Sequence, residues 1–258
     1  MEKRNFAFTL AETLIVIGII GVVAALTIPT LNSETNSKDK VTKVKKAYSV
    51  LEDAVGRMVS DLGPINEWAS IDSAKLTGKV ASYMKTTKKC IDSTSISDKC
   101  FSASAMPIQT SGGVGKTAIN GTYPSFLLAD GISVSLISDS GSCEDVTGFD
   151  VAKVCGMAII DVDGPSKGKD QYGLDLFAFY ITPDGLTPVG LSNDTNYSFA
   201  STDGGTTPGA CLGATDKLGC TAWVIFNGNM DYNKSNAGTC VDGTNGLKWD
   251  QGYESCAD

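Results

Sequence analysis

The stretch FAFTLAETLIVIGIIGVVAALTIPTL, residues Phe6–Leu31, determines the fold that we expect for this chain. From Phe8 to Ile28 it is almost wholly apolar, and its 21 residues would make a helix about 31 Å long, close to the hydrocarbon thickness of a bilayer. One carboxylate, Glu12, lies near its start. A charge inside such a run costs roughly 2.5–3.5 kcal/mol, so we expect Glu12 to have a partner.

The flanks of this stretch favour a membrane-spanning helix over a secretory signal peptide. Residues 1–7 are short and carry Lys3 and Arg4. A signal peptide would have a shorter apolar region followed by a small-residue cleavage site. We expect the span to cover residues 8–30, with Pro29 kinking or interrupting the helix at the membrane exit.

Residues 31–62 predict an amphipathic continuation of the same helix. Apolar residues three and four apart form one stripe, which consists of Val41, Val44, Tyr48, Leu51, Val55, Met58 and Leu62. Gly63-Pro64 predicts the end of the helix. We expect the stripe to pack on a globular head formed by residues 63–258; an independent coiled coil is the alternative.

The N-terminus resembles that of type IV pilins and type II secretion pseudopilins, the prepilin-type cleavage and methylation family. The family pattern is a short basic leader, a small residue, Phe-Thr-Leu, a Glu fifth after the cut, and about twenty apolar residues before a Pro. Ala7, Phe8-Thr9-Leu10, Glu12 and Pro29 match it, with Ala7 where Gly is usual. The likeness covers about 55 residues and implies a pilin-like α+β fold.

This resemblance implies a processing route and a set of partners. A prepilin peptidase would cut between Ala7 and Phe8 and methylate the new amine of Phe8. Glu12 would pair with the N-terminal amine of a neighbouring subunit, and partners would include homologous subunits, the lipid bilayer and an inner-membrane assembly platform. The precursor would lie in the bacterial inner membrane with an extracytoplasmic head, and then in a pilus or pseudopilus.

Other interpretations of the N-terminal segment stay open. Glu12 could be a polar residue tolerated near the lipid headgroups. The chain could also be a membrane-anchored binding or adhesion module that does not polymerise.

Composition disfavours several function classes. The net charge of −8 opposes general nucleic-acid binding. The chain contains no histidine, which removes the commonest general base and metal ligand. No nucleophile has a nearby base in sequence, so we do not expect an enzyme, and an anchored enzyme would need a pocket with perturbed acids.

Eight cysteines favour disulfides in an oxidising compartment, because none is spaced C-x-x-C. We predict the sequential pairs, each closing a short loop: Cys90–Cys100, Cys143–Cys155, Cys211–Cys220 and Cys240–Cys256. Free buried thiols in a cytosolic protein are the alternative.

One signal conflicts with an extracytoplasmic head. Five lysines follow the span, and the positive-inside rule alone would keep them in the cytoplasm: Lys38, Lys40, Lys43, Lys45 and Lys46.

The remainder predicts an antiparallel sheet with disulfide-stapled loops, which makes the fold α+β. Residues 75–84 predict a short helix, and residues 86–122 and 190–220, rich in Ser, Thr, Gly and Asn, predict surface loops. The expected strands are Ser125–Leu128, Ile132–Ile137, Met157–Val162, Asp175–Ile181 and Ala222–Phe226.

Residues 159–185 resemble pseudopilin sequences in which a strand ends in an Asp/Asn-Gly loop. Four acids of this segment form a weak calcium candidate: Asp161, Asp163, Asp170 and Asp175. Their spacing does not fit an EF-hand, and ordinary turn chemistry explains the same residues. Otherwise we expect no metal and no cofactor.

The stretch SGGVGKT, residues 111–117, differs by one residue from the phosphate loop of deviant-Walker ATPases. A phosphate loop needs a helix after it, and Gly121 and Pro124 oppose one here. We therefore do not expect nucleotide binding.

Overall fold

The structure of this protein is a computed structural model. It describes residues 10–67, 71–91, 100–101, 107–109, 116–118, 124–138, 143, 154–167, 170–191, 194, 197, 199, 211–212, 217–234 and 247. The leader, the cleavage position between Ala7 and Phe8 and the methylation of Phe8 lie outside the described residues. The chain divides into two compact units, Met1–Asp39 and Lys40–Asp258.

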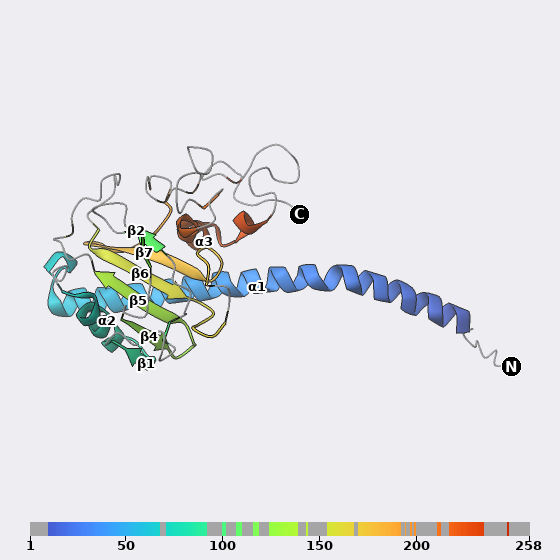
Figure 1. Cartoon of the computed structure of the whole chain (residues 1–258), viewed down its shortest axis with the longest axis horizontal. Coiled ribbons are helices and arrows are strands. Elements are labelled where there is room, and N and C mark those ends of the chain that lie inside the picture. Colours follow the sequence, from blue (N-terminus) through green and yellow to red (C-terminus); the bar gives the residue numbers. More distant parts are fainter. Residues whose placement is uncertain are drawn as a thin grey trace, which may run out of the picture. The chain divides into compact units, whose positions relative to one another are not determined.

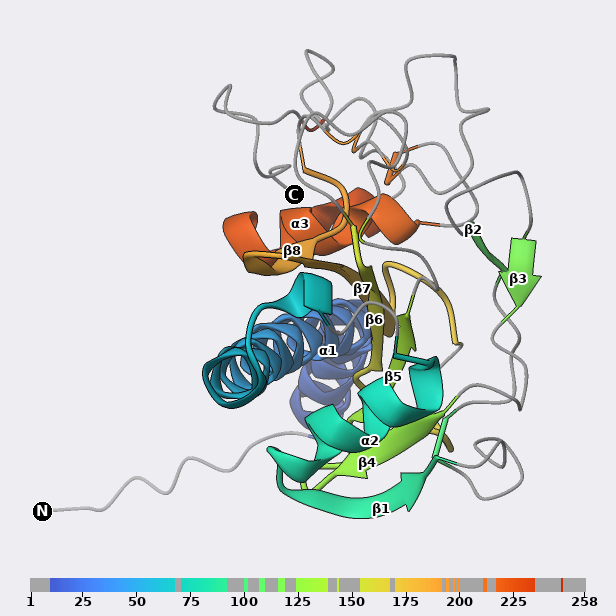
Figure 2. The same ribbon diagram turned by 90° about the vertical axis from the view of Figure 1, so that its left-hand side faces the viewer.

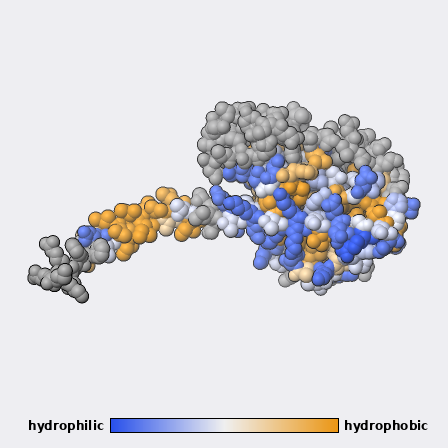
Figure 3. All heavy atoms as spheres, turned by 180° about the vertical axis from the view of Figure 1, so that it is seen from behind, coloured by the Kyte–Doolittle hydropathy of each residue, from blue (hydrophilic) through white to orange (hydrophobic). Residues whose placement is uncertain are grey.

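The first unit consists of the N-terminal part of helix α1 (Leu10–Leu62), drawn in blue in Figure 1. Within it, Leu10–Ile28 is long and apolar enough to cross a membrane or to act as a signal sequence, and no other described helix is. Its apolar side chains are exposed, with Leu10 at 78% and Leu26 at 71%, and Figure 3 shows them as a continuous apolar band. The helix continues through Pro29, so the predicted interruption was wrong.

In the second unit, the remaining part of α1 packs its apolar stripe against a sheet. Val44, Leu51 and Met58 are fully buried, and the ring of Tyr48 stacks on Phe179 with 5.2 Å between centroids. The Tyr48 hydroxyl donates a hydrogen bond to the Leu186 carbonyl at 3.2 Å. The stripe is therefore part of the head core, which excludes an independent coiled coil. Leu62, the last residue of the predicted stripe, is exposed.

The head contains a six-stranded antiparallel sheet in the order β1-β4-β5-β6-β7-β8. The strands are β1 (Thr86–Cys90), β4 (Ser125–Leu128), β5 (Ser133–Ser138), β6 (Gly156–Asp161), β7 (Leu176–Thr182) and β8 (Gly185–Pro188). Strand β4 lies where we predicted it, and β5, β6 and β7 are each displaced by one residue. Together with the helices, this sheet confirms the α+β class.

Both faces of the central strands are buried. One face carries Ala158, Ile160, Phe177 and Phe179 and packs against the helices. The other carries Ile159, Leu176, Ala178 and Tyr180 and is covered by residues of the connecting loops, among them Phe101, Val154, Tyr172, Tyr197 and Leu218. This explains why β6 and β7 are continuous buried runs rather than alternating ones.

Helix α2 (Ser73–Ser82) covers the part of the sheet formed by β1, β4 and β5, as Figure 2 shows. Its N-cap is Asp72, whose carboxylate accepts a hydrogen bond from the Lys75 amide at 2.8 Å. Leu76 and Val80 are buried in the core. The predicted helix over residues 75–84 is therefore present and begins two residues earlier.

Two parts of the chain differ from the sequence-based expectation. Residues Ala222–Phe226 belong to helix α3 (Thr221–Asn227) rather than to a strand, and on this helix Trp223 is fully buried and stacks on Phe199 at 4.1 Å. A short apolar run has too little periodicity to distinguish a helix from a strand. The predicted loop over 86–122 contains three strands, namely β1, β2 (Pro107–Gln109) and β3 (Lys116–Ala118), of which β2 and β3 form a separate two-stranded sheet.

Candidate functional site

Glu12 lies in the first turn of the described part of α1. It is exposed, and so are the apolar side chains that follow it, including Leu14 and Ile15. The span does not bury this carboxylate by itself, so its low-polarity surroundings would come from lipid or from other chains. Such surroundings penalise a lone carboxylate by several kcal/mol and penalise a carboxylate paired with a cation much less.

Three lysines of α1 form ion pairs with two hairpin connections of the head. The Asp163 carboxylate lies 3.1 Å from Lys40 Nζ and 3.8 Å from Lys43 Nζ. Lys46 Nζ lies 2.8 Å from Asp130 Oδ2. We call these five residues the lysine anchor, because they hold the start of the head's helix to the sheet.

The two connections of the lysine anchor come from the same end of the sheet. Asp130 lies between β4 and β5, Asp163 follows β6, and Ser133 pairs with Asp161 across the neighbouring strands. The connections touch at Gly164, where a Cβ atom would lie 2.4 Å from the Gly131 carbonyl oxygen. Only a residue without a side chain fits that contact, and Gly164 also has φ +78°.

Three of the five lysines after the span pair with aspartates that lie far from them along the chain. The sequence marked these lysines as a group but contained no signal for their partners. The pairing leaves the charge conflict in place, because the positive-inside rule counts Lys and Arg and gives Asp and Glu little weight.

Asp161 is a buried carboxyl beneath the anchor. Its Oδ1 accepts hydrogen bonds from the amides of Asp163 at 3.1 Å and Gly164 at 3.0 Å. Its Oδ2 and Asp170 Oδ1 are buried and have no hydrogen-bond partner among the described residues. Burial, with smaller contributions from the charges of Asp170 and Asp175, raises the pKa of Asp161 to about 7.

The four aspartates of the calcium candidate have separate roles. Asp163 pairs with lysines, and Asp175 accepts hydrogen bonds from the amides of Asp170 and Gln171 at 3.2 and 2.6 Å. Within the described part of the chain, no group of three or more His, Cys, Asp or Glu residues could hold a metal ion. The described residues thus give the calcium candidate no support.

Three of the four predicted disulfides are present: Cys90–Cys100, Cys143–Cys155 and Cys211–Cys220. Cys143, Cys155, Cys211 and Cys220 belong to the apolar cluster that also contains the buried residues of α1. The fourth predicted pair, Cys240–Cys256, lies outside the described residues. The sequential pairing is confirmed for three pairs, and free thiols are excluded at these six positions.

The described residues do not support a phosphate loop. Lys116 and Thr117 lie in strand β3, which pairs with β2, whereas a phosphate loop places these residues at a helix start. Residues 111–115 lie outside the described part.

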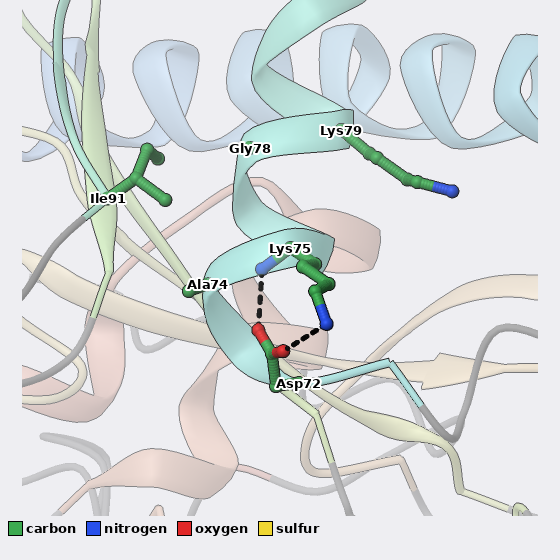
Figure 4. A pocket seen from close by; sticks show the side chains of 6 residues that line it. All are labelled: Asp72, Ala74, Lys75, Gly78, Lys79 and Ile91. Carbon is green, nitrogen blue, oxygen red and sulfur yellow. Dashed lines mark hydrogen bonds and ion pairs between the residues drawn. The ribbon is translucent and has the colours of Figure 1, made fainter.

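A shallow hollow of about 500 Å³ lies between α2 and the end of β1. Figure 4 shows its lining: Asp72, Ala74, Lys75, Gly78, Lys79 and Ile91. Its single carboxylate is the cap of α2, and the hydrogen bond from the Lys75 amide holds the pKa of Asp72 below its usual value. The other carboxylate oxygen of Asp72 lies 3.1 Å from Lys75 Nζ, so both polar groups are engaged at the start of the helix.

No protein-family model, no curated protein and no solved structure matches this chain.

Proposed function

We propose that this chain is a pilin-like structural subunit of a type IV pilus or of a type II secretion pseudopilus. It is made as a single-pass precursor in the bacterial inner membrane, with its head outside the cytoplasm. Prepilin peptidase removes residues 1–7, and Phe8 becomes the methylated N-terminus. The mature chain assembles through the N-terminal part of α1 into a filament.

The observation that carries this proposal is Glu12 within an exposed, membrane-length apolar helix. A carboxylate there is costly alone and much less costly when an ammonium group meets it. A cut before Phe8 creates such an ammonium group four residues upstream. By the family resemblance, we assign the amine of a neighbouring subunit as the partner of Glu12.

Two further features support the proposal. The second part of α1 is built into the head core, so one helix serves both as a filament element and as the spine of a folded domain. Three disulfides fit an oxidising compartment.

The replacement Glu12→Leu tests the proposal, with Glu34→Leu as the matched control. Both remove one exposed carboxylate from α1, but Glu34 lies beyond the apolar span. We expect Glu12→Leu to insert into membranes normally and to form no filaments, as judged by electron microscopy and by sedimentation of sheared material. The control should assemble like the wild type.

An intact-mass measurement on the cellular protein tests the processing. The expected mass lacks Met1–Ala7, gains one methyl group and shows the deficit of four disulfides. A mature protein that keeps Met1–Ala7 contradicts the processing. Normal insertion without any assembly, together with a replaceable Glu12, fits an anchored binding module instead.

A further inference from the structure

The segment SAKLTGKVASYMKTTKKC, residues 73–90, is strongly basic in an acidic protein. It contains five lysines and no Asp or Glu, whereas the whole chain has a net charge of −8. All five side chains are exposed. We call them the lysine face: Lys75, Lys79, Lys85, Lys88 and Lys89.

The fold collects these lysines at one edge of the sheet. Lys75 and Lys79 lie on α2, Lys88 and Lys89 lie on β1, and α2 packs against β1. Strand β1 is the first strand in the sheet order. Lysines on an edge strand discourage pairing with strands of other chains. This explains Lys88 and Lys89, which lie on β1, but not the other three lysines.

A second charged surface lies on the solvent side of α1 and of the short 3-10 helix (Ile65–Glu67) that follows it, within the same unit. Residues 47–67 carry four acids and one base, a net charge of −3. The acids are exposed and form what we call the acidic face: Glu52, Asp53, Asp61 and Glu67. Arg57 pairs with Asp53 at 2.6 Å, and Tyr83 donates a hydrogen bond to Asp61 at 2.9 Å.

The two faces belong to helices that cover different parts of the sheet. Through Tyr48, α1 contacts β7 and β8, whereas α2 covers β1, β4 and β5. The two helices meet at Tyr83, the C-cap of α2, whose hydroxyl donates to Asp61 and whose carbonyl accepts a hydrogen bond from Arg57 at 3.2 Å. Figure 2 shows α2 and β1 beside each other. One chain therefore presents a positive and a negative surface that adjoin at Tyr83.

We propose that the lysine face of one copy docks on the acidic face of α1 of a second copy. Two different surfaces that fit each other join subunits head to tail into a ring or, where the rotation does not close, into an open filament, and the open form is the one that the proposed function needs. Exposed charges of this kind contribute orientation and register more than affinity. This inference rests on the proposed filament function and names the head surfaces that set its register.

Paired charge reversal tests the docking in the full-length chain. One variant combines Lys85→Glu and Lys89→Glu, and the other combines Glu52→Lys and Glu67→Lys. The first variant alone lowers the charge of the lysine face from +5 to +1 against −3, and the second alone sets +1 against +5. Co-precipitation between two differently tagged copies should therefore weaken in the first variant and be lost in the second. When the two variants are produced together, the intact lysine face of the second meets the intact acidic face of the first, so co-precipitation should return, whereas filaments, which need this contact at every subunit, should not.

A control with the same charge change combines Lys45→Glu and Lys167→Glu, which are exposed and belong to neither face. It should associate like the wild type. Normal association of both reversed variants, or no recovery in the mixture, overturns this docking while leaving the filament proposal intact. Absence of association between wild-type copies overturns the filament proposal itself.

Discussion

Asp161 is a single residue whose surroundings favour its neutral form. It is fully buried, and its pKa of about 7 lies above the value of 3.8 for a free Asp side chain. A raised carboxyl pKa means that the folded state binds the proton more tightly than the unfolded state. Its contribution to stability is therefore complete below about pH 4 and is lost as the pH rises towards 7.

We expect Asp161→Asn to remove this pH dependence. Asn keeps the Oδ1 acceptor for the amides of Asp163 and Gly164 and carries no charge. At pH 8 the variant should be more stable than the wild type by on the order of 2 to 4 kcal/mol, and the gain should shrink towards pH 4. Thermal unfolding of the full chain between pH 4 and pH 8 measures this difference in stability between the variant and the wild type.

Asp184→Asn is the control, because Asp184 is exposed in the turn between β7 and β8. Its unfolding curve should follow that of the wild type across the range. Parallel curves for Asp161→Asn and the wild type would contradict the burial argument.

Among the secondary-structure elements, predictability depended on local pattern. Helix α1 repeats its apolar positions over many turns and ends at Gly63-Pro64, so its end at Leu62 was predictable. Strand β1 has the sequence TTKKC. Its exposed lysines are not typical of a strand, so the sequence did not predict it. The run at Thr221–Asn227 is apolar but short, so its pattern fits a helix and a strand equally well.

The lysine anchor predicts a local effect at the first head turns of α1. Asp163→Ala should leave Lys40 and Lys43 without their shared partner, at a cost of about 1–2 kcal/mol. Hydrogen exchange should become faster at the amides of residues 41–46, while the amides of β6 and β7 remain protected. Equal exchange in Asp163→Ala and in the exposed-site control Asp184→Ala would argue against the anchor.

The contact between the two connections of the lysine anchor predicts that alanine destabilises the protein more at Gly164 than at Gly185. Gly164→Ala would place a Cβ atom 2.4 Å from the Gly131 carbonyl, whereas Gly185, with φ +132°, has open space around its Cβ position. Both variants bear backbone strain, of the order of 1 kcal/mol, but only Gly164→Ala must also separate the connections. It should lower the melting temperature by clearly more than Gly185→Ala does; equal losses would rule out a tight contact.

At the scale of the whole molecule, the sequence predicted the class of the fold but not how the site is assembled. The cysteine spacing led to three correct pairs, because neighbouring cysteines close short loops. The partnership of Lys40 with Asp163 joins residues more than a hundred positions apart, and no local pattern encodes it. The loop layer over the second face was equally hidden, since its residues come from polar segments.

We expect the double replacement Cys211→Ser and Cys220→Ser to loosen the apolar cluster to which both residues belong. The bridge closes a loop with a sequence separation of 9, and its loss should lower stability by about 2–4 kcal/mol. Thermal unfolding measures the loss, and limited proteolysis should cut residues 200–217 sooner. Reducing agent should abolish the difference between variant and wild type; a difference that persists would show that the serines act by another route.

The bridges Cys143–Cys155 and Cys211–Cys220 lie in the same apolar cluster as α1, so they couple completion of this core to the redox chemistry of the surroundings. In a reducing space the cluster would lack both covalent ties, and packing alone would hold it. In an oxidising space both ties would close, and the head would reach its full stability only there.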